Sequence, residues 1–400
     1  MPVRPVHAFL IQVAVQLHRY GAPSHRLERV MTKVASGLGI EGVFLYTPTA
    51  LVISLTDDQG ERTYLRRVNS GAIDIDKLVR TDETLDRLLV GEITVAAAGE
   101  RLSEIARSSS PYASWITVLA CALSCGAVAI FFRGSPNEIM AAVGLGIVVA
   151  LIEQVHIRLA WEQGFFEPVA GLVAALGALA VARFVVPLDD RLVTLAALIV
   201  MIPGLKITVA LTELAVGHLS AGVARLAGGC VSLLTLSIGV AISWRLAGSW
   251  RNLPDPAAWH APEWWQWIAI AVAPVAFSIV FRARPSLWPT ITLVAVAGYV
   301  SNLTMGRWWG LEVGAFSGAL VVGIGSNLYA RFRDRPALVT LTPGIIVLVP
   351  GSLGYRSLTA LLDRETLAGV DFAFNMLIVA MALVGGILTA NVIMPPRRLM

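Results

Sequence analysis

Pro203-Gly204 and Pro350-Gly351 close two copies of one motif, Ala-Arg-Phe followed by Leu-Val-Thr-Leu and then Pro-Gly. The first copy reads Ala182-Arg183-Phe184, Leu192-Val193-Thr194-Leu195 and Pro203-Gly204, and the second reads Ala330-Arg331-Phe332, Leu338-Val339-Thr340-Leu341 and Pro350-Gly351. The three blocks are offset by 148, 146 and 147 residues, and small differences of this kind are typical of a duplicated and diverged segment. Each Pro-Gly pair ends a short apolar run. Interrupted segments in matching positions of two halves are the best sequence indication of a transporter binding site.

The composition places most of the chain in a lipid bilayer. Of 400 residues, 56% are hydrophobic and 14% are charged, and the mean hydropathy is +0.71, which excludes an ordinary soluble enzyme. Residues 1–110 are polar and net neutral, and all eleven Trp follow them. The +4 net charge comes from arginines between apolar runs, without a basic cluster for nucleic acid.

Residues 1–110 are expected to form a soluble, cytoplasmic α+β domain. Apolar residues recur at helical spacing in 5–20, and again after Ser24, which we expect to cap the second helix. Residues 43–55 and 63–68 have strand composition and are separated by an Asp-Asp-Gln-Gly turn, which predicts a hairpin. Helical patterning returns over 74–107.

After Pro111 the pattern predicts a multi-pass α-helical membrane protein with ten transmembrane helices. The expected spans are 112–132, 138–157, 166–186, 190–204, 221–244, 264–281, 287–305, 311–330, 337–350 and 372–394. The repeats are then 111–248 and 264–400, joined by a linker at 249–263. Because each repeat has an odd number of spans, the second would enter the membrane from the opposite side, giving a 5+5 inverted repeat. A bias of basic residues, twelve against eight, favours cytoplasmic N- and C-termini.

Three motifs resemble the threonine/serine exporter (ThrE) family, most closely the branch that includes the fungal pheromone-regulated membrane proteins. They are Tyr20-Gly21-Ala22-Pro23-Ser24-His25-Arg26-Leu27-Glu28, Phe44-Leu45-Tyr46-Thr47-Pro48 and Pro350-Gly351-Ser352-Leu353-Gly354-Tyr355-Arg356-Ser357-Leu358. The resemblance covers nearly the whole chain. It implies a secondary exporter in a cell or inner membrane, with threonine and serine as substrates and the proton gradient as driving force.

The two Pro-Gly pairs are the first candidates for the substrate pathway. Proline removes a backbone donor, so the break frees polar backbone groups that must line a wet cavity or be buried in protein. The alternative is that each pair only ends a helix at the membrane surface. Hydroxyls of Ser352, Thr194 and Thr340 could contact substrate, or could bond back to carbonyls of their own helices.

Polar groups within apolar runs supply the remaining candidates. Glu153 follows a nearly uninterrupted apolar run and could carry a proton, or could lie in the headgroup layer with His156. Asn327 is included in the pathway, although interhelical bonding is the more frequent role of such a residue. Glu213 and His218 follow the first Pro-Gly pair and are expected on a solvated face.

No cofactor or metal site is expected, and we predict that the chain is not an enzyme. It has no Walker A motif, HExxH motif or metal-like cysteine spacing. His25 and Glu28 share a helical face, which leaves a membrane-tethered hydrolase as an alternative, and a receptor or scaffold acting through residues 1–110 is another. The leading hypothesis is a proton-coupled exporter of small hydroxy amino acids.

Overall fold

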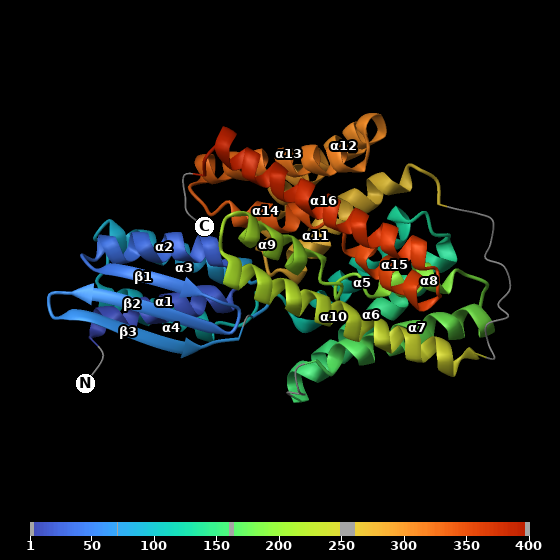
Figure 1. Ribbon diagram of the computed structural model, residues 1–400, viewed down its shortest axis with the longest axis horizontal. Coiled ribbons are helices and arrows are strands. Elements are labelled where there is room, and N and C mark those ends of the chain that lie inside the picture. Colours follow the sequence, from blue (N-terminus) through green and yellow to red (C-terminus); the bar gives the residue numbers. More distant parts are fainter. Residues whose placement is uncertain (1–3, 70, 160–163, 249–260, 397–400) are drawn as a thin grey trace.

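The computed structural model describes residues 4–69, 71–159, 164–248 and 261–396. Its N-terminal region is a three-stranded antiparallel sheet of order β1-β2-β3, packed with four helices (Figure 1). These elements are α1 (Pro5–Arg19), α2 (Ser24–Gly37), β1 (Glu41–Tyr46), β2 (Ala50–Asp57), β3 (Gly60–Arg67), α3 (Ile75–Leu89) and α4 (Val95–Arg107). They share one hydrophobic core, which includes Leu10, Met31, Ile53 and Leu102.

The predicted hairpin is present as β2–β3, with Asp57 paired to Gly60 across the turn. The segment predicted as one long strand is divided into β1 and β2. Thr47 closes the turn between them, since its Oγ1 accepts from the amide of Ala50 at 3.0 Å, and Pro48 cannot donate to a ladder. The prediction that Ser24 caps α2 is wrong: Ser24 is the first residue of the helix, and Pro23 precedes it at the cap position.

The described residues after α4 are mostly helical. The first set of helices is α5 (Ser114–Phe131), α6 (Pro136–Leu159), α7 (Phe166–Phe184), α8 (Asp190–Ala197), α9 (Gly204–Ala215) and α10 (Leu219–Leu246). The second is α11 (Trp265–Val280), α12 (Trp288–Trp309), α13 (Leu311–Arg333), α14 (Leu338–Ile345), α15 (Gly351–Leu362) and α16 (Thr366–Ile393). Most of the predicted linker, 249–260, lies outside the described residues.

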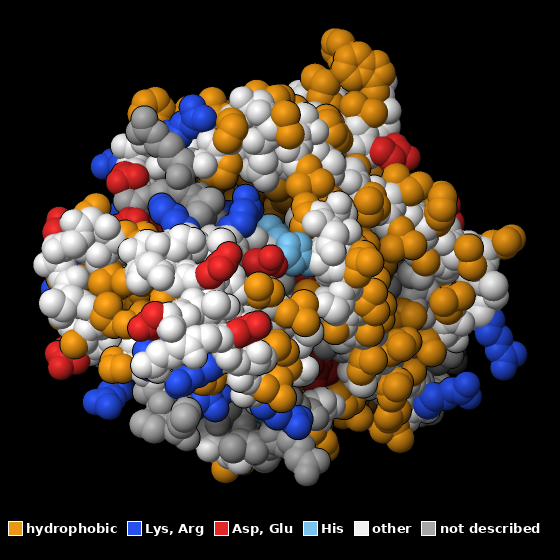
Figure 2. Space-filling view, turned by 60° about the vertical axis from the view of Figure 1, so that its left-hand side comes forward, with side chains coloured by type: hydrophobic (Ala, Val, Ile, Leu, Met, Phe, Trp, Pro, Cys, Tyr) orange, Lys and Arg blue, Asp and Glu red, His pale blue; other side chains and the backbone are white. Residues whose placement is uncertain are grey.

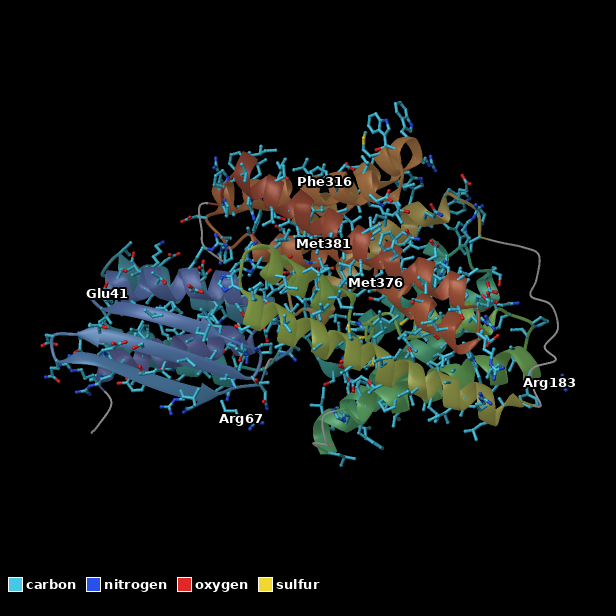
Figure 3. The ribbon with its side chains drawn as sticks, in the orientation of Figure 1. Glu41, Arg67, Arg183, Phe316, Met376 and Met381 are labelled. Carbon is cyan, nitrogen blue, oxygen red and sulfur yellow. The ribbon has the colours of Figure 1, made fainter. Side chains whose placement is uncertain are left out.

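In the described part of the chain, six helices are long and apolar enough to cross a membrane: α5, α6, α7, α10, α13 and α16. Helix α11 is apolar but has only 16 residues. Large hydrophobic side chains on these helices point outward; Leu367 is 89% exposed, as suits a lipid-facing surface. Figure 3 places Glu41 and Arg67 at the end that carries the sheet and Arg183 at the opposite end, with Phe316, Met376 and Met381 between them. The chain is therefore a mostly helical membrane protein.

The apolar runs 190–204 and 337–350, each predicted as one span, are instead broken helices. In the first, α8 ends at Ala197 and α9 begins at Gly204; in the second, α14 ends at Ile345 and α15 begins at Gly351. The proline before each second helix has no N–H to continue a helix. Each motif copy thus builds two short helices separated by a Pro-Gly break.

Matching glycines allow matching helix crossings in the two halves. A Cβ atom built on Gly239 of α10 would lie 2.0 Å from the carbonyl oxygen of Pro168 on α7. One built on Gly386 of α16 would lie 2.4 Å from the carbonyl oxygen of Phe316 on α13. Only glycine permits backbones to approach so closely, and the two pairs sit at the repeat offset.

The broken helices end at opposite ends of the helical region (Figure 1). Near the end of α9, Glu213 accepts a hydrogen bond from the amide of Ser24 on α2, in the N-terminal region. Beyond the end of α15, Asp363 pairs with Arg191 on α8 at 2.7 Å. Helix α9 therefore runs toward the N-terminal region, and α15 runs away from it.

Candidate functional site

The two Pro-Gly breaks meet in the centre of the helical region. Pro203 has φ −78° and ψ 32°, and Pro350 has φ −81° and ψ 35°, so the local backbone is nearly the same in both. A Cβ atom built on Gly204 would lie 2.8 Å from the Cα atom of Gly351. The repeated motif therefore brings the two backbones into direct contact at a crossing, made by residues 203–204 and 350–351.

Two helix N-termini lie at this crossing. Helices α9 and α15 both begin there, and neither has a side-chain cap. The first amides of a helix carry partial positive charge and suit an anionic group such as a carboxylate. Ser352, the second residue of α15, is partly buried beside them. The Gly204 amide already donates to the Ile202 carbonyl at 2.8 Å, so the next amides of α9 and the amides that open α15 are the backbone donors for a small carboxylate.

The two threonines of the motif are fully buried in α8 and α14. The Thr194 hydroxyl donates to the Asp190 carbonyl at 2.6 Å, and the Thr340 hydroxyl lies 3.5 Å from the Ala337 carbonyl. Both contacts are to their own helices, which matches the alternative of back-bonding.

A cavity of about 780 Å³ lies between α2 and the helices α9, α14 and α16. Its helical wall begins at Leu205, the residue after Gly204, and continues along α9 through Thr208 and Thr212. Figure 2 shows histidine side chains in a hollow where charged side chains meet the apolar helical region. Residues of α2 complete the lining: His25, Arg26, Glu28, Arg29, Thr32, Lys33 and Ser36. We call this space the junction cavity.

The Tyr20–Glu28 motif holds α2 against the helical region. Gly21 has φ +84°, which favours glycine and turns the chain into α2. The amide of Ser24 then donates to Glu213 Oε1 at 2.9 Å, while Arg225 binds both oxygens of the same carboxylate at 3.0 and 3.2 Å. Glu213 is fully buried, so the prediction that it lies on a solvated face is wrong. Packing of α2 over the end of α9 excludes the water.

His25 lies in the junction cavity as a neutral imidazole. Burial, with a smaller contribution from Arg26, lowers the pKa of His25 to about 2. His218 lies 3.5 Å from Glu28, on the cavity wall. His18, seven residues before His25, contacts the Pro48 carbonyl at 3.1 Å. In the described residues, no group of three or more His, Cys, Asp or Glu side chains could hold a metal ion.

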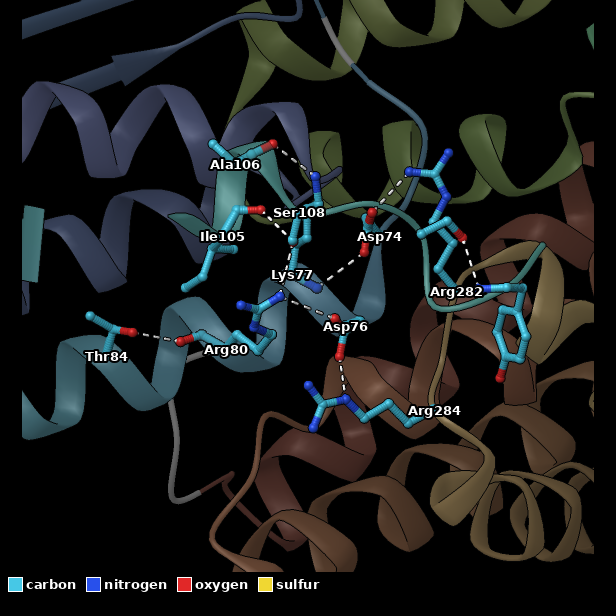
Figure 4. A network of polar contacts seen from close by, with 12 residues as sticks. Asp74, Asp76, Lys77, Arg80, Thr84, Ile105, Ala106, Ser108, Arg282 and Arg284 are labelled. Atoms are coloured by element: carbon cyan, nitrogen blue, oxygen red, sulfur yellow. Dashed lines mark hydrogen bonds and ion pairs between the residues drawn. The ribbon is translucent and has the colours of Figure 1, made fainter. Parts of the chain in front are cut away.

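Ion pairs form a second set of contacts between the N-terminal region and the helical region (Figure 4). Asp74, which caps α3, pairs with Arg282 at 2.9 Å, and Asp76 pairs with Arg284. The amide of Ile75 donates to the Phe281 carbonyl at 3.0 Å. These contacts join α3 to the loop after α11, so both α2 and α3 attach the N-terminal region to the helical region.

Asn327 and Glu153 lie away from the crossing. The Asn327 amide donates to Asn391 Oδ1 at 3.0 Å and to the Met394 carbonyl at 2.8 Å, and thereby joins α13 to α16. Glu153 is partly buried on α6, within electrostatic reach of His156 and Arg282. Neither residue lines the junction cavity.

Sequence reasoning missed the ion pair between Glu213 and Arg225 and the burial of Arg26 in the cavity wall. Both depend on contacts between segments far apart in the chain. The single available signal was the charged Ser-His-Arg-Leu-Glu segment of the first motif, which opens α2 and faces the cavity.

Comparison with known proteins gives matches along most of the chain. A family model described as a putative threonine/serine exporter matches residues 8–247, and one described as threonine/serine exporter, ThrE, matches 266–393. An uncharacterized protein of Schizosaccharomyces pombe is 27% identical over 360 residues, covering 86% of this chain and 47% of that protein.

Several relatives are named pheromone-regulated membrane protein 10, and two of them serve as examples. The Candida albicans protein is 26% identical over 367 residues, 87% of this chain and 33% of that protein. The Eremothecium gossypii protein is 26% identical over 381 residues, 92% of this chain and 50% of that protein. The chain spans half or less of the length of these relatives. No solved structure gives a significant match.

Proposed function

Because this chain belongs to the threonine/serine exporter family, we propose that it is a secondary transporter that exports small hydroxy amino acids. The observation that carries the proposal is the backbone contact between Gly204 and Gly351, where two helix N-termini meet. In secondary transporters, broken helices of two repeats form the substrate site in this way, with helix N-termini toward the substrate carboxylate.

We further propose that the helical region is a 5+5 inverted repeat with ten membrane segments, in which each broken helix counts as one segment. The opposite directions of α9 and α15, and the matching crossings at Gly239 and Gly386, support this arrangement. The proposed domains are 1–110, 111–248 and 264–400. The two family models meet between residues 247 and 266, which supports a boundary there.

In the proposed mechanism, the substrate carboxylate binds first-turn amides of α9 and α15 other than that of Gly204, which donates to Ile202. Ser352, Thr194 and Thr340 shape the pathway, and Asn327 holds α13 against α16. Rocking of one repeat against the other then opens the crossing to each side in turn. The N-terminal domain lies over one end of the pathway in the cytoplasm and controls entry through the junction cavity.

Proton antiport is the proposed driving reaction, and Glu153 is the proposed proton carrier. It is a partly buried carboxylate within a spanning helix, where an unpaired charge is costly and protonation is favoured. A Glu153→Gln variant should keep exchange of substrate for substrate and lose transport driven by a pH gradient.

Counterflow in proteoliposomes tests the proposal. The purified chain is reconstituted with unlabelled serine inside, and uptake of labelled serine or threonine is followed with and without a pH gradient. We expect saturable uptake of both, faster than that of alanine and valine, which lack the hydroxyl. The absence of saturable flux for every amino acid tested would refute the proposed function.

A further inference from the structure

Arg26 is a buried cation that has no anionic partner among the residues that the structure describes. Its side chain lines the junction cavity, the residue is 4% exposed, and Nη1 has no hydrogen-bond partner among the described residues. Burial lowers the pKa of Arg26 to about 10, so the guanidinium is still charged at neutral pH. Because an unpaired buried charge costs several kcal/mol or more, the arrangement is suited to receiving an anion.

The surroundings of Arg26 make one wall of the cavity electropositive. Arg29 and Lys33 also line it from α2, and Glu28 is the one carboxylate among the lining residues. The nearby carboxylate of Glu213 does not compensate Arg26, because Arg225 already binds both of its oxygens. The cavity is therefore selective for a ligand with a negative group and tolerates one positive group near Glu28.

The facing wall can hold a small, partly polar ligand. Thr208 and Thr212 on α9 donate their hydroxyl protons to the carbonyls of Gly204 and of Thr208, at 3.1 and 2.9 Å. The lone pairs of these oxygens are left to accept from an ammonium or a hydroxyl group. The apolar remainder of the wall, including Leu205 and Leu341, disfavours a larger, fully polar anion.

We propose that Arg26 binds the α-carboxylate of the transported amino acid in the junction cavity, before the substrate reaches the crossing. A guanidinium and a carboxylate form two parallel hydrogen bonds. Glu28 faces the substrate ammonium, and Thr208 and Thr212 lie on the route toward Gly204. This inference rests on the proposed transport function and assigns the N-terminal domain a recruiting site.

Equilibrium binding to the purified full-length chain tests the site. The probes are serine, serinol without the carboxylate, 3-hydroxypropanoate without the ammonium, and inorganic phosphate, each followed by calorimetry. We expect serine to bind, 3-hydroxypropanoate to bind more weakly, and serinol and phosphate not to bind measurably. Phosphate binding more tightly than serine would overturn the carboxylate assignment in favour of a general anion site.

Matched variants separate Arg26 from its neighbours. Arg26→Gln should weaken serine binding by at least about tenfold, which is the loss of a charge-assisted hydrogen bond. Arg29→Gln removes the same charge from an exposed neighbour on the cavity wall and should weaken binding less than Arg26→Gln does. Arg67→Gln, an exposed arginine outside the cavity, is the matched control and should change binding by less than about threefold. Equal serine binding by the wild type and Arg26→Gln would overturn the proposal.

A measurement on the wild type avoids dependence on a variant that fails to fold. Phenylglyoxal modifies arginines, and peptide mass spectrometry reports each site. Serine should protect Arg26 and leave the exposed Arg67 unprotected; equal modification of Arg26 with and without serine would contradict the site. Serine binding that depends on Arg26, with no measurable flux, would refute the proposed transport function and leave the binding site standing. Serine flux with an unchanged KM in the Arg26→Gln variant would refute the recruiting site and leave the transport function standing.

Discussion

Replacing Gly204 by alanine should force the two helix breaks apart. The new Cβ atom would lie 2.8 Å from the Cα atom of Gly351 and 2.6 Å from Cγ1 of Val349. The Val349 side chain can rotate, but the backbone of Gly351 cannot move without shifting α15. The perturbation therefore acts on the relative position of the two repeats.

The magnitude follows from that overlap. Overpacking of this kind costs about 1–3 kcal/mol, and alanine recovers at most about 1 kcal/mol over glycine in a helix. Gly351→Ala should cost less, because its Cβ atom would meet a side-chain methyl of Ile202 at 2.9 Å and would stay 3.3 Å from the nearest backbone atom, the Cα atom of Gly204. Gly228→Ala is the matched control: its Cβ atom would meet nothing within 4 Å, so the helix should gain stability.

The apparent Tm in detergent and counterflow of labelled serine are the two assays. We expect the apparent Tm and the serine flux to be highest in Gly228→Ala, lower in Gly351→Ala and lowest in Gly204→Ala. Serine flux in Gly204→Ala should be reduced by about tenfold or more. A Gly204→Ala protein with wild-type Tm and wild-type flux would refute the close contact and its role.

Three further predictions concern stability. Arg282→Gln leaves the buried Asp74 carboxylate without its ion pair, and should lower the free energy of unfolding by about 1–2 kcal/mol and speed proteolysis of the N-terminal region; unchanged proteolysis would contradict this anchoring role. Gly239→Ala places a Cβ atom 2.0 Å from the Pro168 carbonyl oxygen and should lower the apparent Tm more than Gly204→Ala does. Thermal melts of the two variants measure this order, and a smaller loss for Gly239→Ala would contradict it. His25 has a pKa of about 2 when folded and about 6.5 when unfolded, so its contribution to stability is present above pH 6.5 and is lost as the pH falls toward 2. At pH 5 the free energy of unfolding should be about 2 kcal/mol lower than above pH 6.5 because of His25. Equal slopes of stability against pH for wild type and His25→Gln would contradict this contribution.

The local pattern of this sequence predicts more of the secondary structure than of the site. Apolar runs and turn residues located most helices and the β2–β3 hairpin, and the motifs indicated the family, which the family models confirm. Burial of Glu213 was not predictable, because an acid on an amphipathic segment has the same pattern whether it meets water or Arg225. The broken helices were predicted only as short spans, since apolarity continues across residues 198–203 although the helix does not.

Opposed orientation of the two repeats is the central claim, and two-sided labelling tests it most directly. Ser220→Cys at the start of α10 and Thr366→Cys at the start of α16 are both exposed, and each is introduced with Cys230→Ser, which removes the exposed native thiol. A membrane-impermeant maleimide is applied to sealed vesicles of each orientation. We expect Ser220→Cys to react from the side of the N-terminal domain and Thr366→Cys from the other side. Reaction of both from the same side would contradict the inverted repeat.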